Sequence, residues 1–184
     1  QSAAKSAGEA GESLEQGELD QAEQQEEQVQ RELDRALDDL KEEEEQYQRL
    51  RQEELLFRIT EEAAALLEGQ KNGLAQVREV DAARAGAAQP SRADRLRLRR
   101  IARDEGQLAS RSGELAQAIE AEQSFVFAHV LREVEQDLER VARDLDETGD
   151  YQTGERVQSL MEDAIETTSW VLEALKREQR ERQQ

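Results

Sequence analysis

The segment 125–145, "FVFAHVLREVEQDLERVARDL", decides the fold class of this chain. Its apolar side chains alternate four and three residues apart, at Phe127, Leu131, Val134, Leu138, Val141 and Leu145. This spacing places them on one face of an α-helix and leaves the charged side chains on the other. The segment therefore predicts an amphipathic helix, starting at Ser124, that buries its apolar face against other helices.

The segments on either side have the same helical period. Before it, Gly86 and Pro90 interrupt a helical pattern, and Ser91 with Asp94 three residues later predicts the start of a new helix. The predicted core positions of that helix are Leu98, Ile101, Leu108, Leu115 and Ile119. After it we predict a last helix with core positions Val157, Met161, Ala164, Thr168, Val171 and Leu175.

A much longer helix is predicted over residues 18–86. In its first half the apolar stripe is narrow, has coiled-coil spacing and is interrupted by Glu43 and Glu54: Leu33, Ala36, Leu40, Tyr47, Leu50, Phe57 and Ala64. In its second half the stripe widens, at Leu56, Ile59, Ala63, Leu66, Gly73 and Val77. A wide stripe indicates more than one neighbour, so the second half is expected to join the three later helices in a bundle.

These patterns predict an all-α fold, a long helix with an antiparallel helical bundle and coiled-coil hairpins. We expect residues 1–50 to form an N-terminal helical hairpin and an acidic helical arm, and residues 51–184 to form the bundle. The composition agrees, since 38% of the residues are charged, 3% are aromatic and only one is proline. Disordered chains share such a composition, but the regular apolar period favours helices.

The net charge of −19 argues against general binding to DNA, RNA or anionic membranes, because affinity for phosphate is built from clustered Lys and Arg. The absence of cysteine excludes disulfides and thiolate metal sites. No run of about 18 apolar residues is present, so no transmembrane segment is predicted in this chain. The sequence begins without an initiator Met or a signal peptide, and we expect it to be part of a longer protein.

The segment 144–161, "DLDETGDYQTGERVQSLM", predicts a corner between two helices. The predicted structural residues of this turn are Gly149, Tyr151, Thr153 and Gly154. We expect Tyr151 to fill the corner, and Thr153 or Asp150 to cap the helix that follows. A similar order of residues in "LEQGELDQA" predicts a second corner at Gly17. Both segments are typical of turn structure rather than of catalysis.

Four helical segments appear in a particular order: "LLEGQKNGLAQV", "RLRLRRIARDEGQLASRSGELAQAI", "FVFAHVLREVEQDLERVARDLDETGDYQTGERVQ" and "LMEDAIETTSWVLEALK". Over residues 50–178 this order resembles a family of large helical, coiled-coil cell-envelope proteins of planctomycete-type bacteria. The chain departs from that pattern with "ETGDYQTG" where the family usually has Asp-Thr-Gly. The resemblance implies a cell-envelope setting, with a membrane anchor elsewhere in the protein, and it implies no activity.

The segment 92–111 contains seven arginines and three acids, a local charge of +4, and its candidate interaction residues are Arg92, Arg95, Arg99, Arg100 and Arg103. Such a cluster could bind phosphate, RNA or an acidic lipid surface. Residues 9–54, in contrast, contain eighteen acids and five bases. No lysine or aromatic residue is interleaved with the arginines, so we favour charge matching with this acidic arm, within one chain or between subunits.

Three further features were considered as sites. Neighbouring carboxylates of "KEEEEQ" (41–46) diverge around a helix, so a metal site is not predicted there. His129 is the only histidine, and Glu122 and Glu133 lack the Glu-x-x-His spacing of di-metal bundles, so we expect a partly buried structural side chain. Trp170 is expected at the core or the bundle edge, and if exposed it becomes a candidate residue for binding a partner.

The sequence thus predicts no catalytic, metal-binding or cofactor-binding residue. The expected function is that of a non-catalytic spacer, scaffold or oligomerisation segment that docks with other helices, either of its own kind, as in a homodimer, or of the parent protein. One alternative is binding to an anionic surface or nucleic acid through residues 92–111. A second alternative is a ligand-binding or enzymatic helical bundle.

Overall fold

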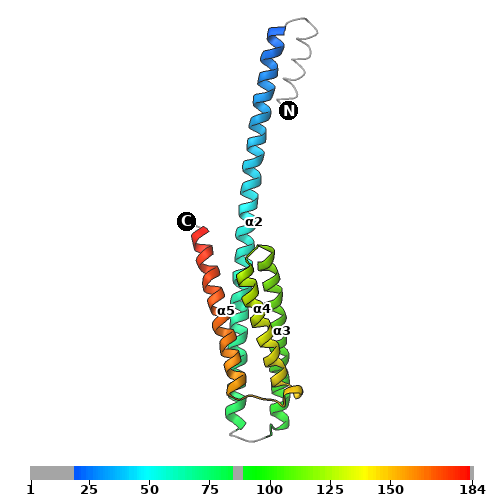
Figure 1. Ribbon diagram of the computed structural model, residues 1–184, viewed down its shortest axis with the longest axis vertical. Helices are drawn as coiled ribbons and strands as arrows, with labels where there is room; N and C mark the ends of the chain where they lie inside the picture. Colours follow the sequence, from blue (N-terminus) through cyan, green and yellow to red (C-terminus); the bar gives the residue numbers. More distant parts are fainter. Residues whose placement is uncertain (1–18, 85–88, 183–184) are drawn as a thin grey trace. The chain divides into compact units, whose positions relative to one another are not determined.

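The computed structural model describes residues 19–84 and 89–182, and it confirms the all-α fold (Figure 1). The helices in these ranges are α2 (Leu19–Arg84), α3 (Arg92–Ala121), α4 (Phe125–Leu145) and α5 (Glu155–Arg182), with a short 3-10 helix, η1 (Glu147–Gly149), after α4. The described residues contain no strand. The turn predicted at Gly17 and the break predicted at Gly86 lie outside the described residues.

The chain divides into two compact units, residues 1–52 and 53–184, and α2 contributes to both. The sequence had placed this boundary between residues 50 and 51. In the first unit the described residues form one helix, whose basic side chains pair with acids one turn away: Arg31 with Glu27 at 3.2 Å, Lys41 with Asp38 at 3.4 Å and Arg49 with Glu45 at 3.6 Å. Exposed pairs of this kind stabilise a helix by about 0.2–0.5 kcal/mol each.

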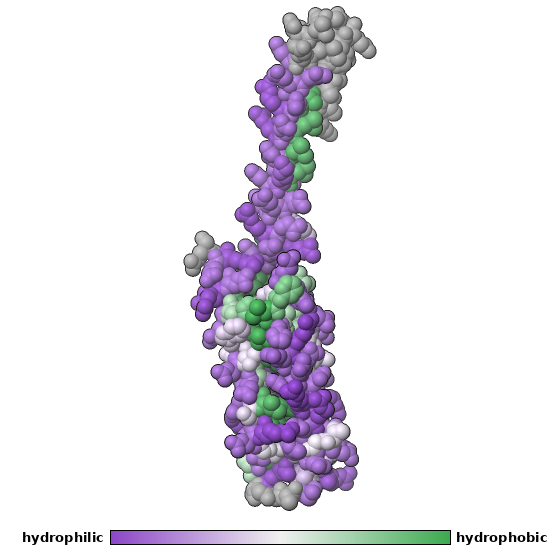
Figure 2. Space-filling view, viewed as in Figure 1, coloured by the Kyte–Doolittle hydropathy of each residue, from purple (hydrophilic) through white to green (hydrophobic). Residues whose placement is uncertain are grey.

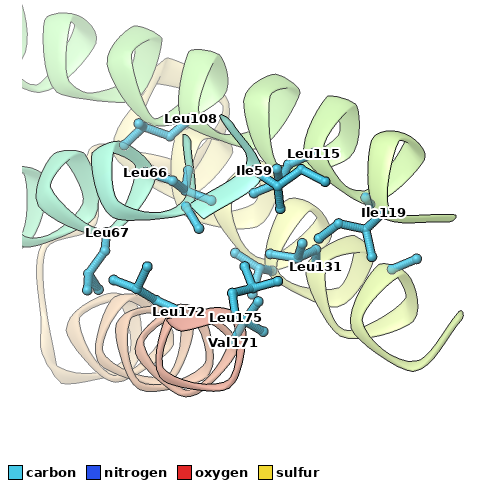
Figure 3. Packing of buried hydrophobic residues seen from close by; sticks show 14 of the residues in the cluster. Ile59, Leu66, Leu67, Leu108, Leu115, Ile119, Leu131, Val171, Leu172 and Leu175 are labelled. Atoms are coloured by element: carbon cyan, nitrogen blue, oxygen red, sulfur yellow. The ribbon is translucent and has the colours of Figure 1, made fainter. Parts of the chain in front are cut away.

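In the second unit the last part of α2 packs with α3, α4 and α5 as a bundle of four helices (Figure 1). All the core positions predicted for α3 and α5 are buried, as are those predicted for the second half of α2. Figure 3 shows the larger apolar cluster, with side chains from all four helices around a common centre: Ile59, Leu66 and Leu67 of α2, Leu108, Leu115 and Ile119 of α3, Leu131 of α4, and Val171, Leu172 and Leu175 of α5.

The start of α3 follows the predicted chemistry. The Ser91 hydroxyl accepts a hydrogen bond from the Asp94 backbone N–H at 3.1 Å, and the Ser91 backbone N–H donates to the Asp94 carboxylate at 3.0 Å. The side-chain hydrogen bond with Ser91 is also the main reason that the pKa of Asp94 is lowered. This reciprocal capping box satisfies two backbone donors that a helix start otherwise leaves unpaired.

The turn between α3 and α4 settles how residues 121–124 fold. Gln123 has a left-handed backbone, with φ of 62°, and α4 begins directly after Ser124. The Ser124 backbone N–H donates to the Ile119 carbonyl at 3.2 Å. The chain therefore reverses here, and α3 and α4 lie antiparallel (Figure 1).

No helix among the described residues is both long enough and apolar enough to cross a membrane.

Candidate functional site

The corner between α4 and α5 is built on a close backbone approach at Gly149. A Cβ atom added there would lie 2.5 Å from the Arg143 carbonyl oxygen and 2.4 Å from Cα of Asp144, so a hydrogen atom is all that fits. The two residues that follow, Asp150 and Tyr151, have left-handed backbones with φ of 55° and 56°. Non-glycine residues adopt this conformation at a cost, so the surrounding hydrogen bonds must hold the turn in place.

Tyr151 fills the corner. Its side chain is buried in the smaller apolar cluster, with Leu145 of α4 and Val157 of α5 as fellow members. The guanidinium carbon of Arg99 lies 5.8 Å from the centre of its ring, and Arg99 also pairs with Glu147 at 2.7 Å. Arg99, one of the candidate interaction residues, is thereby engaged with the corner in this structure.

Thr153 connects the corner to α2. Arg84 donates to the Thr153 hydroxyl and to the Tyr151 carbonyl, both at 3.0 Å. The Thr153 hydroxyl donates in turn to the Asp81 carboxylate at 2.5 Å, and Gln158 of α5 donates to the Thr153 carbonyl at 2.8 Å. The Thr153 hydroxyl, which was expected to cap α5, instead forms hydrogen bonds with side chains of α2. Gly154 has open space around its Cα, unlike Gly149.

Three arginines of α3 have acidic partners within residues 53–184. Arg97 pairs with Glu79 of α2, Arg111 pairs with Glu62 of α2 at 2.8 Å, and Arg99 pairs with Glu147 as described above. We expected partners in the acidic arm, residues 9–54, and these three instead pair with the bundle. The reason is proximity, because α3 packs directly against the second half of α2.

The other candidate arginines, Arg92, Arg95, Arg100 and Arg103, are exposed and form no ion pair with any described residue. Arg92, Arg95, Arg99 and Arg103 follow one another at three- and four-residue spacing, so they share one side of α3. Leu96 lies between them and is also exposed. The four unpaired arginines named above, Arg92, Arg95, Arg100 and Arg103, are called the Arg face, a basic surface on an acidic protein.

The arm presents an apolar stripe to solvent. Five large side chains of the arm are 50–66% exposed: Leu33, Leu37, Leu40, Tyr47 and Leu50. Figure 2 shows green, hydrophobic surface along this otherwise purple part of the molecule. None of residues 26–52 is buried. We refer to these five side chains as the arm stripe. The spacing of four of them was predicted from the sequence, and Leu37 is an addition from the structure. Their exposure means that the described part of the first unit leaves them without an apolar partner.

Trp170 meets the condition set for a candidate interaction residue, because its side chain is 52% exposed. Its ring centre lies 5.6 Å from that of Phe127, which is only partly buried, although its spacing had predicted a core position. Phe125 and Val126 at the start of α4 are exposed as well. The contact of Trp170 with Phe127 is thus a second exposed apolar feature, separate from the arm stripe in sequence.

His129 is exposed and lies 3.6 Å from Glu133 one turn later. The prediction of a partly buried histidine is therefore wrong. The physical reason is its phase on α4, since a residue two positions after Phe127 points away from the core face. The described residues contain no group of three His, Cys, Asp or Glu side chains that could hold a metal ion.

Of the buried polar residues that the sequence did not predict, two have unpaired side chains. Glu105 of α3 and Gln70 of α2 are each 1% exposed, and their side-chain polar atoms have no hydrogen-bond partner among the described residues. Burial, assisted by the charge of Asp104, raises the pKa of Glu105 to about 8. In α2 and α3 these residues fall between the segments that form the two apolar clusters. Their burial could have been predicted from helical spacing, because both residues occupy core positions of their helices.

The structure thus brings Arg99, Tyr151 and Thr153 together in a closed structural corner, and it leaves the Arg face, Trp170 and the arm stripe exposed. Of these surfaces, the arm stripe has the most large apolar side chains and is the leading candidate for a functional surface. No family model, curated protein or solved structure matches this chain.

Proposed function

We propose that the chain is a non-catalytic interaction segment, a scaffold or spacer of a larger envelope-associated protein, that docks other helices along the arm stripe. The observation that supports this most directly is the exposure of Leu33, Leu40 and Leu50 on a helix in which no side chain from residue 26 to 52 is buried. Removing apolar surface from water is worth about 25 cal/mol per Å². A stripe of this kind is therefore a source of binding free energy that a partner helix can use.

The geometry of the stripe favours a helix as the partner. Leu33, Leu40 and Tyr47 are seven residues apart, and Leu50 lies three residues after Tyr47, as in a coiled-coil seam. Such a narrow stripe is matched by the side chains of one or two helices, and not by a flat surface. The envelope setting rests on the family resemblance over residues 50–178.

A direct test uses a fluorescent four-heptad peptide with a leucine seam and glutamine at the flanking positions. We expect it to bind the full chain and to bind a variant with Leu33→Ser, Leu40→Ser and Leu50→Ser at least about tenfold more weakly, a loss of about 1.4 kcal/mol or more. The matched control, Arg31→Ser, Asp38→Ser and Gln52→Ser, leaves the net charge unchanged and lies on the opposite side of the helix. Equal binding by both variants would remove the arm stripe from the proposal.

The Arg face supports a second candidate function, binding to an anionic surface. Arg92, Arg95, Arg100 and Arg103 are exposed and unpaired among the described residues, and Leu96 adds an exposed apolar contact beside them. We expect the original chain to sediment with phosphatidylserine-containing vesicles at low salt, and a variant with these four arginines replaced by glutamine to remain in the supernatant. Failure of the original chain to sediment with these vesicles would reject this candidate.

A further inference from the structure

We propose that the occupant of the arm stripe is a helix with basic flanks from another protein, and not a second copy of this chain. This inference rests on the proposed function, because it names the partner of the same stripe.

The flanks of the stripe are acidic. When Leu33, Leu40 and Tyr47 are taken as one seam position of a heptad, Glu43 falls on the companion seam position, between Leu40 and Leu50. Asp39 and Glu44 fall on the flanking positions either side of the seam. Residues 19–52 as a whole contain twelve acids and five bases, a net charge of −7.

The bases of the arm do not neutralise these flanks. Arg31, Lys41 and Arg49 form their ion pairs with Glu27, Asp38 and Glu45, all of which lie on the side of the helix away from the stripe. Asp39, Glu43 and Glu44 are exposed and form no ion pair with any described residue. Three of the five bases of the arm are thus paired on its outer side, and Arg51, on the same flank as Glu44, pairs with no described residue. Asp39, Glu43 and Glu44 therefore remain unpaired beside the apolar seam.

A second copy of the arm is a poor occupant. In a parallel pair, a residue on the flank of Asp39 faces the partner residue five positions later, which places Asp39 against Glu44. In an antiparallel pair the facing residues depend on the register, but each arm still carries its net charge of −7 along the shared seam, and this repulsion opposes pairing. Like charges at such positions destabilise a pair and act against the wrong partner. Residues 1–18 of the same chain, with four glutamates and one lysine, meet the same objection.

A helix with lysine or arginine beside an apolar seam would cover the exposed stripe and also pair with the acids beside it. Its apolar side chains cover the arm stripe, and the long stems of its basic side chains lie over the rim of the stripe while their charges meet Asp39, Glu43 and Glu44. Because these pairs remain close to solvent, salt screens them, and the affinity is expected to fall as ionic strength rises.

The experiment compares three labelled four-heptad peptides with the same leucine seam and with lysine, glutamine or glutamate at the flanking positions, each titrated against the full chain by fluorescence anisotropy. We expect the lysine peptide to bind at least about tenfold more tightly than the glutamine peptide at low salt, the glutamate peptide to bind most weakly, and the difference to shrink at moderate salt. Equal binding of all three would overturn the basic partner and leave docking intact. Binding of none would reject the proposed function itself.

Two further measurements separate the stripe from general charge. The variant Asp39→Asn, Glu43→Gln and Glu44→Gln should lose the preference for the lysine peptide. The variant Asp34→Asn, Glu42→Gln and Glu45→Gln, which removes the same charge away from the seam, should keep most of it. Light scattering tests the second copy, since a dimer at low salt that disappears in the Leu33→Ser, Leu40→Ser and Leu50→Ser variant would overturn the inference.

Discussion

The carboxyl group of Glu105 on α3 occupies the space that a side chain at residue Gly73 on α2 would need. A Cβ atom added to Gly73 would lie 1.9 Å from Oε1 of Glu105 and 3.4 Å from Cε of Met161. Glu105 is 1% exposed, so its carboxyl group cannot turn into solvent without disturbing the core. The absence of a side chain at Gly73 is therefore what allows α2 and α3 to enclose this carboxyl group.

Gly73→Ala should destabilise the protein by about 1–3 kcal/mol, because the added methyl group overpacks a buried site. Gly106→Ala is the matched control, since Gly106 is also helical and nothing lies within 4 Å of its added Cβ. That substitution should stabilise the helix by up to about 1 kcal/mol. Urea unfolding of both variants checks the pair.

The same site can be tested as a double-mutant cycle. In a Glu105→Ala background the space beside Gly73 is free, so Gly73→Ala should no longer destabilise. If Gly73→Ala costs the same free energy of unfolding with and without the Glu105 side chain, the contact between these two residues does not explain the glycine.

The stability of the fold should fall as pH rises because of Glu105. Its pKa is raised from 4.5 to about 8, mainly by burial, so the folded chain keeps this proton at neutral pH while the unfolded chain releases it. The stability that this proton contributes to the fold is fully present below pH 4.5 and is lost as pH rises toward about 8. The slope from this one proton is at most about 1.4 kcal/mol per pH unit.

Glu105→Gln removes the titrating group and should flatten the dependence of the unfolding free energy on pH across this range. Glu114→Gln makes the same substitution at an exposed position of α3 and should leave the slope in place. Urea midpoints measured at intervals from pH 5 to about 8 compare the three proteins. Parallel slopes for the original chain and Glu105→Gln would contradict a raised pKa at this site.

The periodicity of apolar residues was sufficient to predict the bundle. It failed at two positions, Glu105 and His129, where residue type misled the prediction of burial. Apolar spacing in α3 identified Leu98, Ile101 and Leu108 as core, but it passed over position 105 because a glutamate is not expected inside. The same spacing reaches position 105, and only the packed structure shows that the carboxyl group is enclosed. The prediction for His129 was wrong for the opposite reason. Its neighbours in sequence are apolar, but its position on α4 lies outside the apolar face.

For the arm stripe, the sequence predicted the apolar positions but not what covers them. Spacing predicted a seam at Leu33, Leu40 and Tyr47. The spacing describes one helix of an interface and does not identify the partner. These side chains are exposed among the described residues, so what covers them depends on another surface. Long-range hydrogen bonds were equally out of reach, since nothing in the sequence relates Thr153 to Asp81 seventy-two residues earlier.

Gly149→Ala should destabilise the protein by more than about 2 kcal/mol, whereas Gly154→Ala should be close to neutral. At Gly149 the added Cβ would meet backbone atoms of Arg143 and Asp144, which cannot move aside as a side chain can. At Gly154, five residues later in the same corner, nothing lies within 4 Å. Thermal unfolding followed by circular dichroism compares the two variants, and equal melting temperatures would show that the corner tolerates a displaced backbone.

The last prediction concerns the hydroxyl that ties this corner to α2. Thr153→Val keeps the shape of the side chain and removes the group that donates to Asp81 and accepts from Arg84. A buried polar group left without its partner typically costs about 1–3 kcal/mol, so Thr153→Val should lose stability in this range. Thr153→Ser keeps the hydroxyl, loses only a methyl group and should be the milder change. Urea unfolding decides, because a valine variant as stable as the serine variant would mean that packing, and not hydrogen bonding, holds the corner against α2.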